Sequence, residues 1–95
     1  MEVGADLAID LSTVEVSVEG RKLDLTATEF KIIQFLASRK GWVFSREKIL
    51  DHLWGSEKSV TDRSVDVHIK HLRDKLGEAG KLIRNVRGIG YKIVE

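Results

Sequence analysis

The sequence predicts an α+β domain in which short strands come first, three helices follow and a β-hairpin ends the chain. Three patterns support this prediction: near-alternation of apolar residues at the N-terminus, helical spacing between residues 28 and 76, and a glycine-containing turn at residues 87–91. The chain has 95 residues and no cysteine. It therefore has room for one core, and disulfides and cysteine-ligated zinc sites are excluded.

The N-terminal third is expected to form an antiparallel meander with one solvated face. Residues 7–11 and 14–18 alternate or nearly so, and a turn at Glu19-Gly20 leads into a third strand at 22–25. Residues 1–30 hold seven acidic and two basic residues, a net charge of −5. Because the whole chain carries +1, the remainder carries +6. The acidic meander is a poor surface for a polyanion, so we expect it to serve packing or docking.

Two helices are predicted next. Thr26 and Glu29 fit a capping box, in which each side chain hydrogen-bonds the backbone amide of the other residue, at the start of a helix over 28–40. Its apolar residues surround most of the axis, so it is expected to be buried on more than one side. After a short extended segment at 42–44, Ser45 caps a second helix over 46–54. Its buried stripe consists of Ile49, Leu50, Leu53 and Trp54.

The third helix, residues 62–76, is capped by Thr61 or Asp62. At about 100° per residue, its core stripe is Val65, Ile69, Leu72 and Leu76. The opposite face carries Arg63, Val67, Lys70, His71 and Asp74, with Ser64 at its edge. Such a helix fits the DNA major groove, where an exposed valine suits a thymine methyl group. Amphipathicity alone equally describes an ordinary surface helix, and only the order of the elements favours the groove.

The last residues, 81–95, are expected to form two strands around a turn at 87–90, with a bulge in the first strand. Gly88 and Gly90 permit positive φ angles and hence a tight turn. Arg87 at its tip suits a minor groove, and Arg84 and Lys92 suit phosphates nearby. The alternative is a purely structural hairpin with a solvated arginine.

In this order the motifs resemble a known family. T-x-x-E-F at Thr26, S-R-E at Ser45, H-x-W-G at His52, D-R-S-V-D-V-H-I-x-x-L-R at Asp62 and V-R-G-x-G-Y at Val86 are similar to the effector domains of OmpR/PhoB-type response regulators. The resemblance covers almost the whole chain. It implies a winged helix-turn-helix fold with an N-terminal antiparallel four-stranded sheet, three helices and a C-terminal β-hairpin wing.

The resemblance also implies a function, sequence-specific binding of double-stranded DNA and transcription regulation as the output domain of a two-component system. Helix 62–76 would enter the major groove and wing 82–94 the minor groove, with two domains in tandem on direct-repeat half-sites. Ser56, Glu57, Lys58 and Ser59 lie in the loop that would contact RNA polymerase. An upstream receiver domain is a further implied partner, and the isolated domain is expected to be a monomer.

Site residues follow from the resemblance, position by position. The DNA-facing helix positions are Arg63, Ser64, Val67, His68, Lys70, His71 and Arg73. Arg46 and Trp54 match backbone contacts of the second helix. Arg87 matches the wing arginine and Tyr91 its phosphate-contacting tyrosine. His71 departs from the family, which often has a base-contacting arginine there; histidine is shorter and mostly neutral at pH 7.

Other functions remain as alternatives. A winged helix used only for protein contact shares the fold, and a DNA-binding domain attached to a non-receiver sensor shares the function. His68 and His71 are close enough on one helix to share a metal, but no third ligand is evident, so no metal site or cofactor is expected. No nucleophile partners the histidines and no phosphate-binding loop is present, so an enzyme is not expected. We expect residues 1–95 to form one cytoplasmic domain that contacts no membrane.

Overall fold

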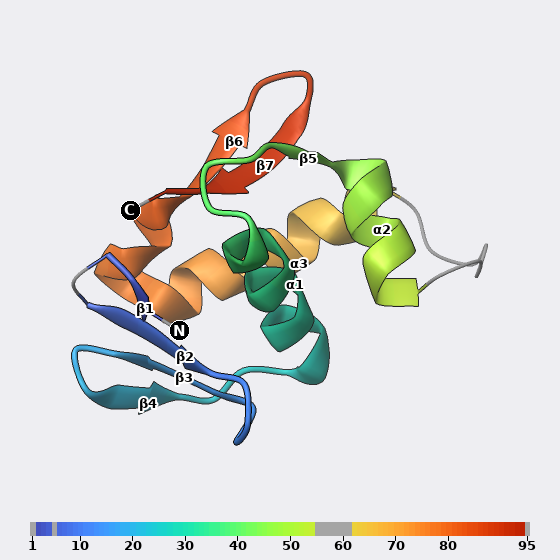
Figure 1. Cartoon of the computed structure of the whole chain (residues 1–95). Helices are drawn as coiled ribbons and strands as arrows, with labels where there is room; N and C mark the ends of the chain where they lie inside the picture. Colours follow the sequence, from blue (N-terminus) through green and yellow to red (C-terminus); the bar gives the residue numbers. More distant parts are fainter. Residues whose placement is uncertain (1, 5, 55–61, 95) are drawn as a thin grey trace.

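The computed structural model describes residues 2–4, 6–54 and 62–94, except for the side chains of Trp54, Asp62, Arg63 and Ser64. An N-terminal sheet and a C-terminal hairpin lie on opposite sides of the helices (Figure 1). The elements are β1 (Glu2–Val3), β2 (Leu7–Asp10), β3 (Glu15–Val18), β4 (Arg21–Leu23), α1 (Ala27–Ser38), β5 (Phe44–Ser45), α2 (Arg46–Trp54), α3 (Asp62–Leu76), the 3₁₀ helix η1 (Gly77–Leu82), β6 (Ile83–Val86) and β7 (Gly90–Ile93).

The N-terminal strands form an antiparallel sheet in the order β1-β2-β3-β4, which confirms the meander. Side chains alternate across a strand, so one face of the sheet enters the core. The buried residues of this face are Val3, Leu7, Ile9, Val16 and Val18. β1 has only two residues, too few for a periodic signal, and the strand was expected from the family resemblance alone.

Helix α1 begins with the predicted capping box. The Glu29 N–H donates to Thr26 Oγ1 at 3.1 Å, and the Thr26 N–H donates to Glu29 Oε1 at 2.9 Å. Helix α1 begins at Ala27 and ends at Ser38, two residues before the predicted end. Helix α1 contacts α2, α3 and β7, and its apolar side chains belong to the common core, as the distribution around the axis predicted.

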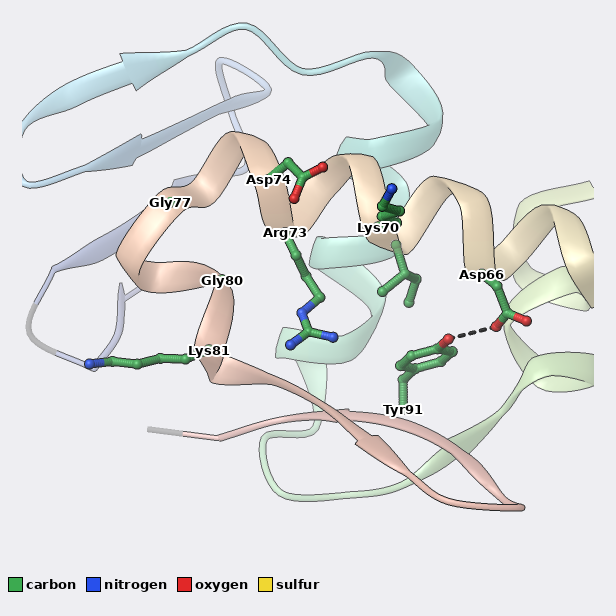
Figure 2. A pocket seen from close by; sticks show the side chains of 9 residues that line it. Asp66, Lys70, Arg73, Asp74, Gly77, Gly80, Lys81 and Tyr91 are labelled. Atoms are coloured by element: carbon green, nitrogen blue, oxygen red, sulfur yellow. Dashed lines mark hydrogen bonds between the residues drawn. The ribbon is translucent and has the colours of Figure 1, made fainter.

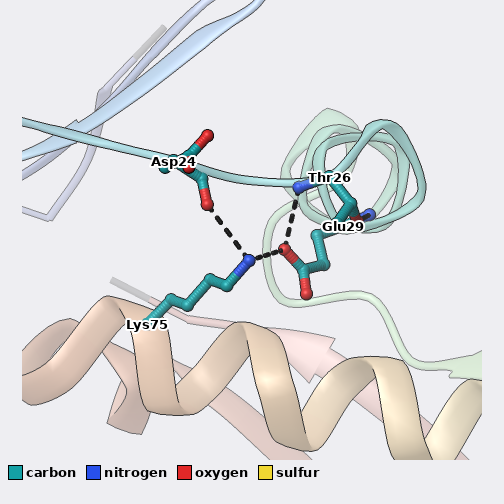
Figure 3. Close-up of polar contacts among 4 residues, drawn as sticks. All are labelled: Asp24, Thr26, Glu29 and Lys75. Atoms are coloured by element: carbon teal, nitrogen blue, oxygen red, sulfur yellow. Dashed lines mark hydrogen bonds and ion pairs between the residues drawn. The ribbon is translucent and has the colours of Figure 1, made fainter.

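The Glu29 carboxylate also joins α1 to α3 (Figure 3). Lys75 Nζ lies 2.7 Å from Glu29 Oε1 and donates to the Asp24 carbonyl oxygen at 3.1 Å. The Glu29 side chain is 3% exposed and that of Lys75 is 39% exposed. Burial alone would raise the pKa of Glu29, but the hydrogen bonds from Lys75 and the Thr26 N–H outweigh burial and hold this pKa below its ordinary value.

Replacing this carboxylate should destabilise the domain in a pH-dependent way. Glu29→Gln weakens both the cap and the contact to Lys75, and we expect a loss of about 1–2 kcal/mol in the free energy of unfolding at pH 7. The folded-state pKa of Glu29 is lowered, so its contribution is fully present above the unfolded value and is lost as pH falls through the folded one. Urea unfolding at pH 7 and at pH 3 should show the difference from wild type shrinking in acid. Glu47→Gln, in the first turn of α2, is the exposed control and should change stability little; an equal loss in both variants would contradict the prediction.

The stripe predicted for α3 forms the centre of the core. Val65, Ile69, Leu72 and Leu76 are each at most 1% exposed and contact α1 and α2. Helix α2 starts as predicted, because the Lys48 N–H donates to Ser45 Oγ at 3.1 Å. Ile49 and Leu53 are buried and Leu50 is partly buried, whereas Trp54 of the same predicted stripe has no described side chain and Thr61 lies outside the described residues.

The C-terminal hairpin joins β5 in a three-stranded sheet of order β5-β7-β6. The strands β6 and β7 pair residue for residue from Ile83↔Ile93 to Val86↔Gly90, so the predicted bulge is wrong. Gly88 has the expected positive φ of 79°, and the Ile89 N–H closes the turn on the Val86 carbonyl oxygen. Gly90 does not share this conformation. It lies in β7, where an added Cβ would overlap the carbonyl oxygen of Phe44.

Between α3 and β6, residues 77–82 form the 3₁₀ helix η1. Ala79 and Gly80 in this helix are buried, and Gly80 lies against the backbone carbonyl of Arg73. The hairpin is thereby held close to α3. Among the described residues, no helix is long and apolar enough to cross a membrane.

Candidate nucleic-acid interface

The outward face of α3 is exposed as predicted. Val67 is 46% exposed, and Lys70, His71 and Arg73 are exposed as well, whereas His68 is half-buried on the other flank of the helix. Helical spacing turns Lys70 and Arg73 toward the hairpin, while Val67 and His71 point away from the core. The predicted exposure of Val67 and His71 is therefore confirmed, while their contact with DNA stays a prediction.

A groove of about 390 Å³ separates α3 from β7. In Figure 2 the guanidinium of Arg73 points into the space between the helix and the hairpin. Tyr91 lines the groove from β7, and Lys70, Asp66 and Asp74 line it from α3. Helix α3, η1 and the hairpin thus line one hollow that contains three basic and two acidic residues.

Asp66 of α3 links three elements. Its Oδ1 accepts a hydrogen bond from Tyr91 Oη of β7 at 2.6 Å (Figure 2). The same oxygen accepts one from Arg46 Nε of α2 at 2.7 Å. The Arg46 guanidinium carbon also lies 5.3 Å from the centre of the Tyr91 ring. A charge that looked unfavourable for DNA is therefore paired within the domain.

Both donors show the effect of this carboxylate. The hydrogen bond to Asp66 raises the pKa of Arg46, and burial followed by the same carboxylate raises the pKa of the Tyr91 hydroxyl. Tyr91 is only 4% exposed. The Tyr91 hydroxyl donates its hydrogen bond to Asp66 within the domain. The phosphate contacts expected of Tyr91 and of Arg46 stay predictions.

The hairpin carries its charges at the tip and on its outer face. Arg87 is exposed in the turn, next to the exposed Ile89. Arg84 and Lys92 are cross-strand partners, on the face opposite Tyr91. Two like charges side by side in a sheet destabilise it slightly, a cost that a nearby anion would offset.

Several predicted site residues cannot be placed. The side chains of Trp54, Arg63 and Ser64 lie outside the described part of the chain. The same holds for Ser56, Glu57, Lys58 and Ser59 of the predicted polymerase-contact loop. In the part of the chain that is described, no three His, Asp or Glu side chains form a group suited to a metal ion.

Asp66 was missed because its partners are remote in sequence. Arg46 precedes it by 20 residues and Tyr91 follows it by 25. No local sequence pattern predicts such a contact. The sequence gives one indication. Asp66 lies on a helix face that is otherwise suited to an anion, and a carboxylate there is expected to have a cation as partner.

Similarity to known proteins agrees with this geometry. Residues 20–93 match the family described as "Transcriptional regulatory protein, C terminal". The transcriptional regulatory protein VxrB of Vibrio cholerae is 46% identical over 91 residues, which are 96% of this chain and 36% of VxrB. The chain therefore spans about a third of that relative's length.

Two solved structures carry the comparison further. The DNA-binding domain of RstA from Klebsiella pneumoniae, in complex with the RstA box, superposes with a TM-score of 0.86 at 33% identity, over 99% of this chain and 95% of that one. DrrB, an OmpR/PhoB homologue from Thermotoga maritima, gives 0.89 at 33% identity, over 99% of this chain and 44% of that one. The chain belongs to the family of C-terminal domains of transcriptional regulatory proteins, as a DNA-binding effector domain of the OmpR/PhoB response-regulator type.

Proposed function

We propose that this domain regulates transcription by binding double-stranded DNA with α3 in the major groove and the wing, residues 82–94, in the minor groove. The supporting observation is the shared surface of α3 and β7, where Lys70 and Arg73 border one groove with Tyr91. Val67 and His71 are exposed on the same helix, where they would face base edges. A hydrogen bond to Asp66 holds Arg46 beside this surface, where its guanidinium would suit a backbone phosphate.

The proposal extends to the whole protein. The chain spans 36% of VxrB, and we place a receiver domain upstream of it in the intact regulator. Two domains would bind direct-repeat half-sites in tandem, each a monomer when isolated, and pairing on DNA would supply much of the affinity. Residues 55–61 would contact RNA polymerase. These parts rest on the family resemblance, as does a cytoplasmic location.

Catalysis has no part in the proposal, because the family is one of transcription regulators. Selection of bound sequences from a random pool of duplex DNA would identify the operator. The pool would also show whether the preferred sites are direct repeats. Recovery of no preferred sequence would favour a winged helix used for protein contact.

Two substitutions test the assignment of helix and wing to their grooves. Lys70→Ala removes a contact to guanine or phosphate, and we expect about tenfold weaker binding of the selected duplex. Arg87→Ala should weaken binding comparably and relax any preference for A·T-rich flanks, since a narrow minor groove attracts arginine. Both are measured by titration of labelled duplex.

Lys22→Ala is the matched control for charge. Lys22 is exposed on β4 and pairs with Glu15, in the sheet on the other side of α1 from the wing (Figure 1). Its removal should leave DNA affinity within about twofold of wild type because exposed pairs contribute little. Equal effects at Lys22, Lys70 and Arg87 would contradict the proposed orientation.

A further inference from the structure

We propose that Asp66 is a positioning residue for DNA binding: its carboxylate holds Arg46 and Tyr91 in place and so fixes α2 and the wing to the recognition helix. The inference rests on the proposed function. It assigns a favourable role to an acidic residue on a surface that binds a polyanion.

Both hydrogen bonds end on the same carboxylate oxygen of Asp66. Asp66 Oδ1 accepts from Arg46 Nε at 2.7 Å and from Tyr91 Oη at 2.6 Å. Hydrogen bonds that involve an ionised group are shorter and stronger than neutral ones. The Nε–H group is only one of the N–H donors of the Arg46 guanidinium, so the same side chain has further donors that suit a phosphate oxygen.

The ring of Tyr91 completes the arrangement. It is almost fully buried, lies under the Arg46 guanidinium, and pairs across the sheet with Phe44 of β5. The residue that anchors β7 therefore also supports the Arg46 side chain. One carboxylate on α3 thus sets the orientation of two neighbours that the family resemblance assigns to the DNA backbone.

Simple electrostatics and positioning predict opposite signs for one substitution. Asp66→Asn removes a negative charge from the DNA-facing side, which by charge alone should tighten binding. If Asp66 positions Arg46 and Tyr91, the same change should weaken binding of a duplex selected by the wild-type domain by about fivefold or more, because the charge-assisted bonds are lost. The sign of the change decides between the two.

Asp74 offers a matched control on the same helix. It lines the same groove and is exposed, and no hydrogen bond or ion pair involves it in the described part of the chain. Asp74→Asn removes an equal charge without freeing a partner, so binding should stay as tight as wild type or become tighter. Asp66→Asn binding as tightly as Asp74→Asn would overturn the proposal.

Two further readouts separate positioning from a general loss of structure. The slope of log affinity against log salt should become less negative by about 0.9 in Asp66→Asn, as in Arg46→Ala, because one phosphate contact is lost in each. In an Arg46→Ala, Tyr91→Phe background, Asp66→Asn should no longer weaken binding, since both groups it positions are gone. Continued weakening in that background, or an unchanged slope, counts against positioning.

The fold of each variant is checked by its thermal unfolding midpoint. If Asp66→Asn does not fold, Asp66→Glu keeps the charge and displaces the carboxylate by one methylene. Weaker binding by a folded Asp66→Glu supports positioning, and unchanged affinity overturns it. Failure of the wild-type domain to bind any duplex would instead contradict the proposed function, so the two failures are distinguishable.

Discussion

Gly90→Ala should be among the most damaging single substitutions in this domain. An added Cβ at Gly90 would overlap the carbonyl oxygen of Phe44 and crowd Ser45, all backbone atoms of β5. Backbone atoms cannot turn aside as a flexible side chain can, so β5 and β7 must separate. We expect a loss of about 3 kcal/mol or more in the free energy of unfolding, at the upper end for overpacking. That is a large share of the roughly 5–15 kcal/mol of an ordinary domain.

The neighbouring glycine of the same hairpin supplies the control. Gly88 has a φ of 79°, but an added Cβ would meet nothing within 4 Å. Gly88→Ala therefore meets only the left-handed backbone penalty of about 1–2 kcal/mol. Thermal unfolding should show midpoint losses of more than about 10 °C for Gly90→Ala and clearly less for Gly88→Ala. Equal losses would mean that the close approach of β5 and β7 does not limit stability.

The two glycines also differ in their effect on the site. Separation of β5 from β7 moves Tyr91, whose partner across the sheet is Phe44 and whose hydroxyl binds Asp66. Gly90→Ala should therefore weaken DNA binding even at temperatures where the domain is folded. Gly88→Ala alters only the turn that carries Arg87.

Features written in local sequence were predictable. The capping box of Thr26 and Glu29 spans three residues, and the stripe from Val65 to Leu76 repeats within one helix. Both depend on short-range geometry that spacing encodes directly. The exposure of Val67 and His71 followed from that stripe, since burying one face of a helix exposes the opposite one.

Features that depend on distant partners were not predictable. The strands β6 and β7 pair without a bulge, and β7 pairs with β5 along its other edge. The alternation within one strand does not encode this register. The partly buried pair of Glu29 and Lys75 joins residues 46 apart. In the sequence Gly90 resembles a turn glycine, but its role is to let the backbone of β5 approach closely. In each case the deciding contact comes from another element.

The affinity for duplex DNA should fall steeply with salt. Among the described residues, Arg46, Lys70, Arg73 and Arg87 supply a minimum set of proposed contacts to phosphate or the grooves, to which Arg84 and Lys92 of the hairpin would add. About four phosphate contacts give a slope near −3.6 in log affinity against log salt, or about a 100-fold loss between 50 and 200 mM. Titrations of one selected duplex at four salt concentrations measure this slope. A slope near zero would leave protein contact as the better function.

This slope is expected although the net charge of the chain is only +1. The acidic sheet and the wing lie on opposite sides of the helices (Figure 1). At 0.1 M salt, charges more than about 10 Å apart are largely screened from one another. DNA at the wing therefore responds mainly to the cations near it. Lys22→Ala should leave the slope unchanged, whereas Arg73→Ala should make it less negative by about 0.9.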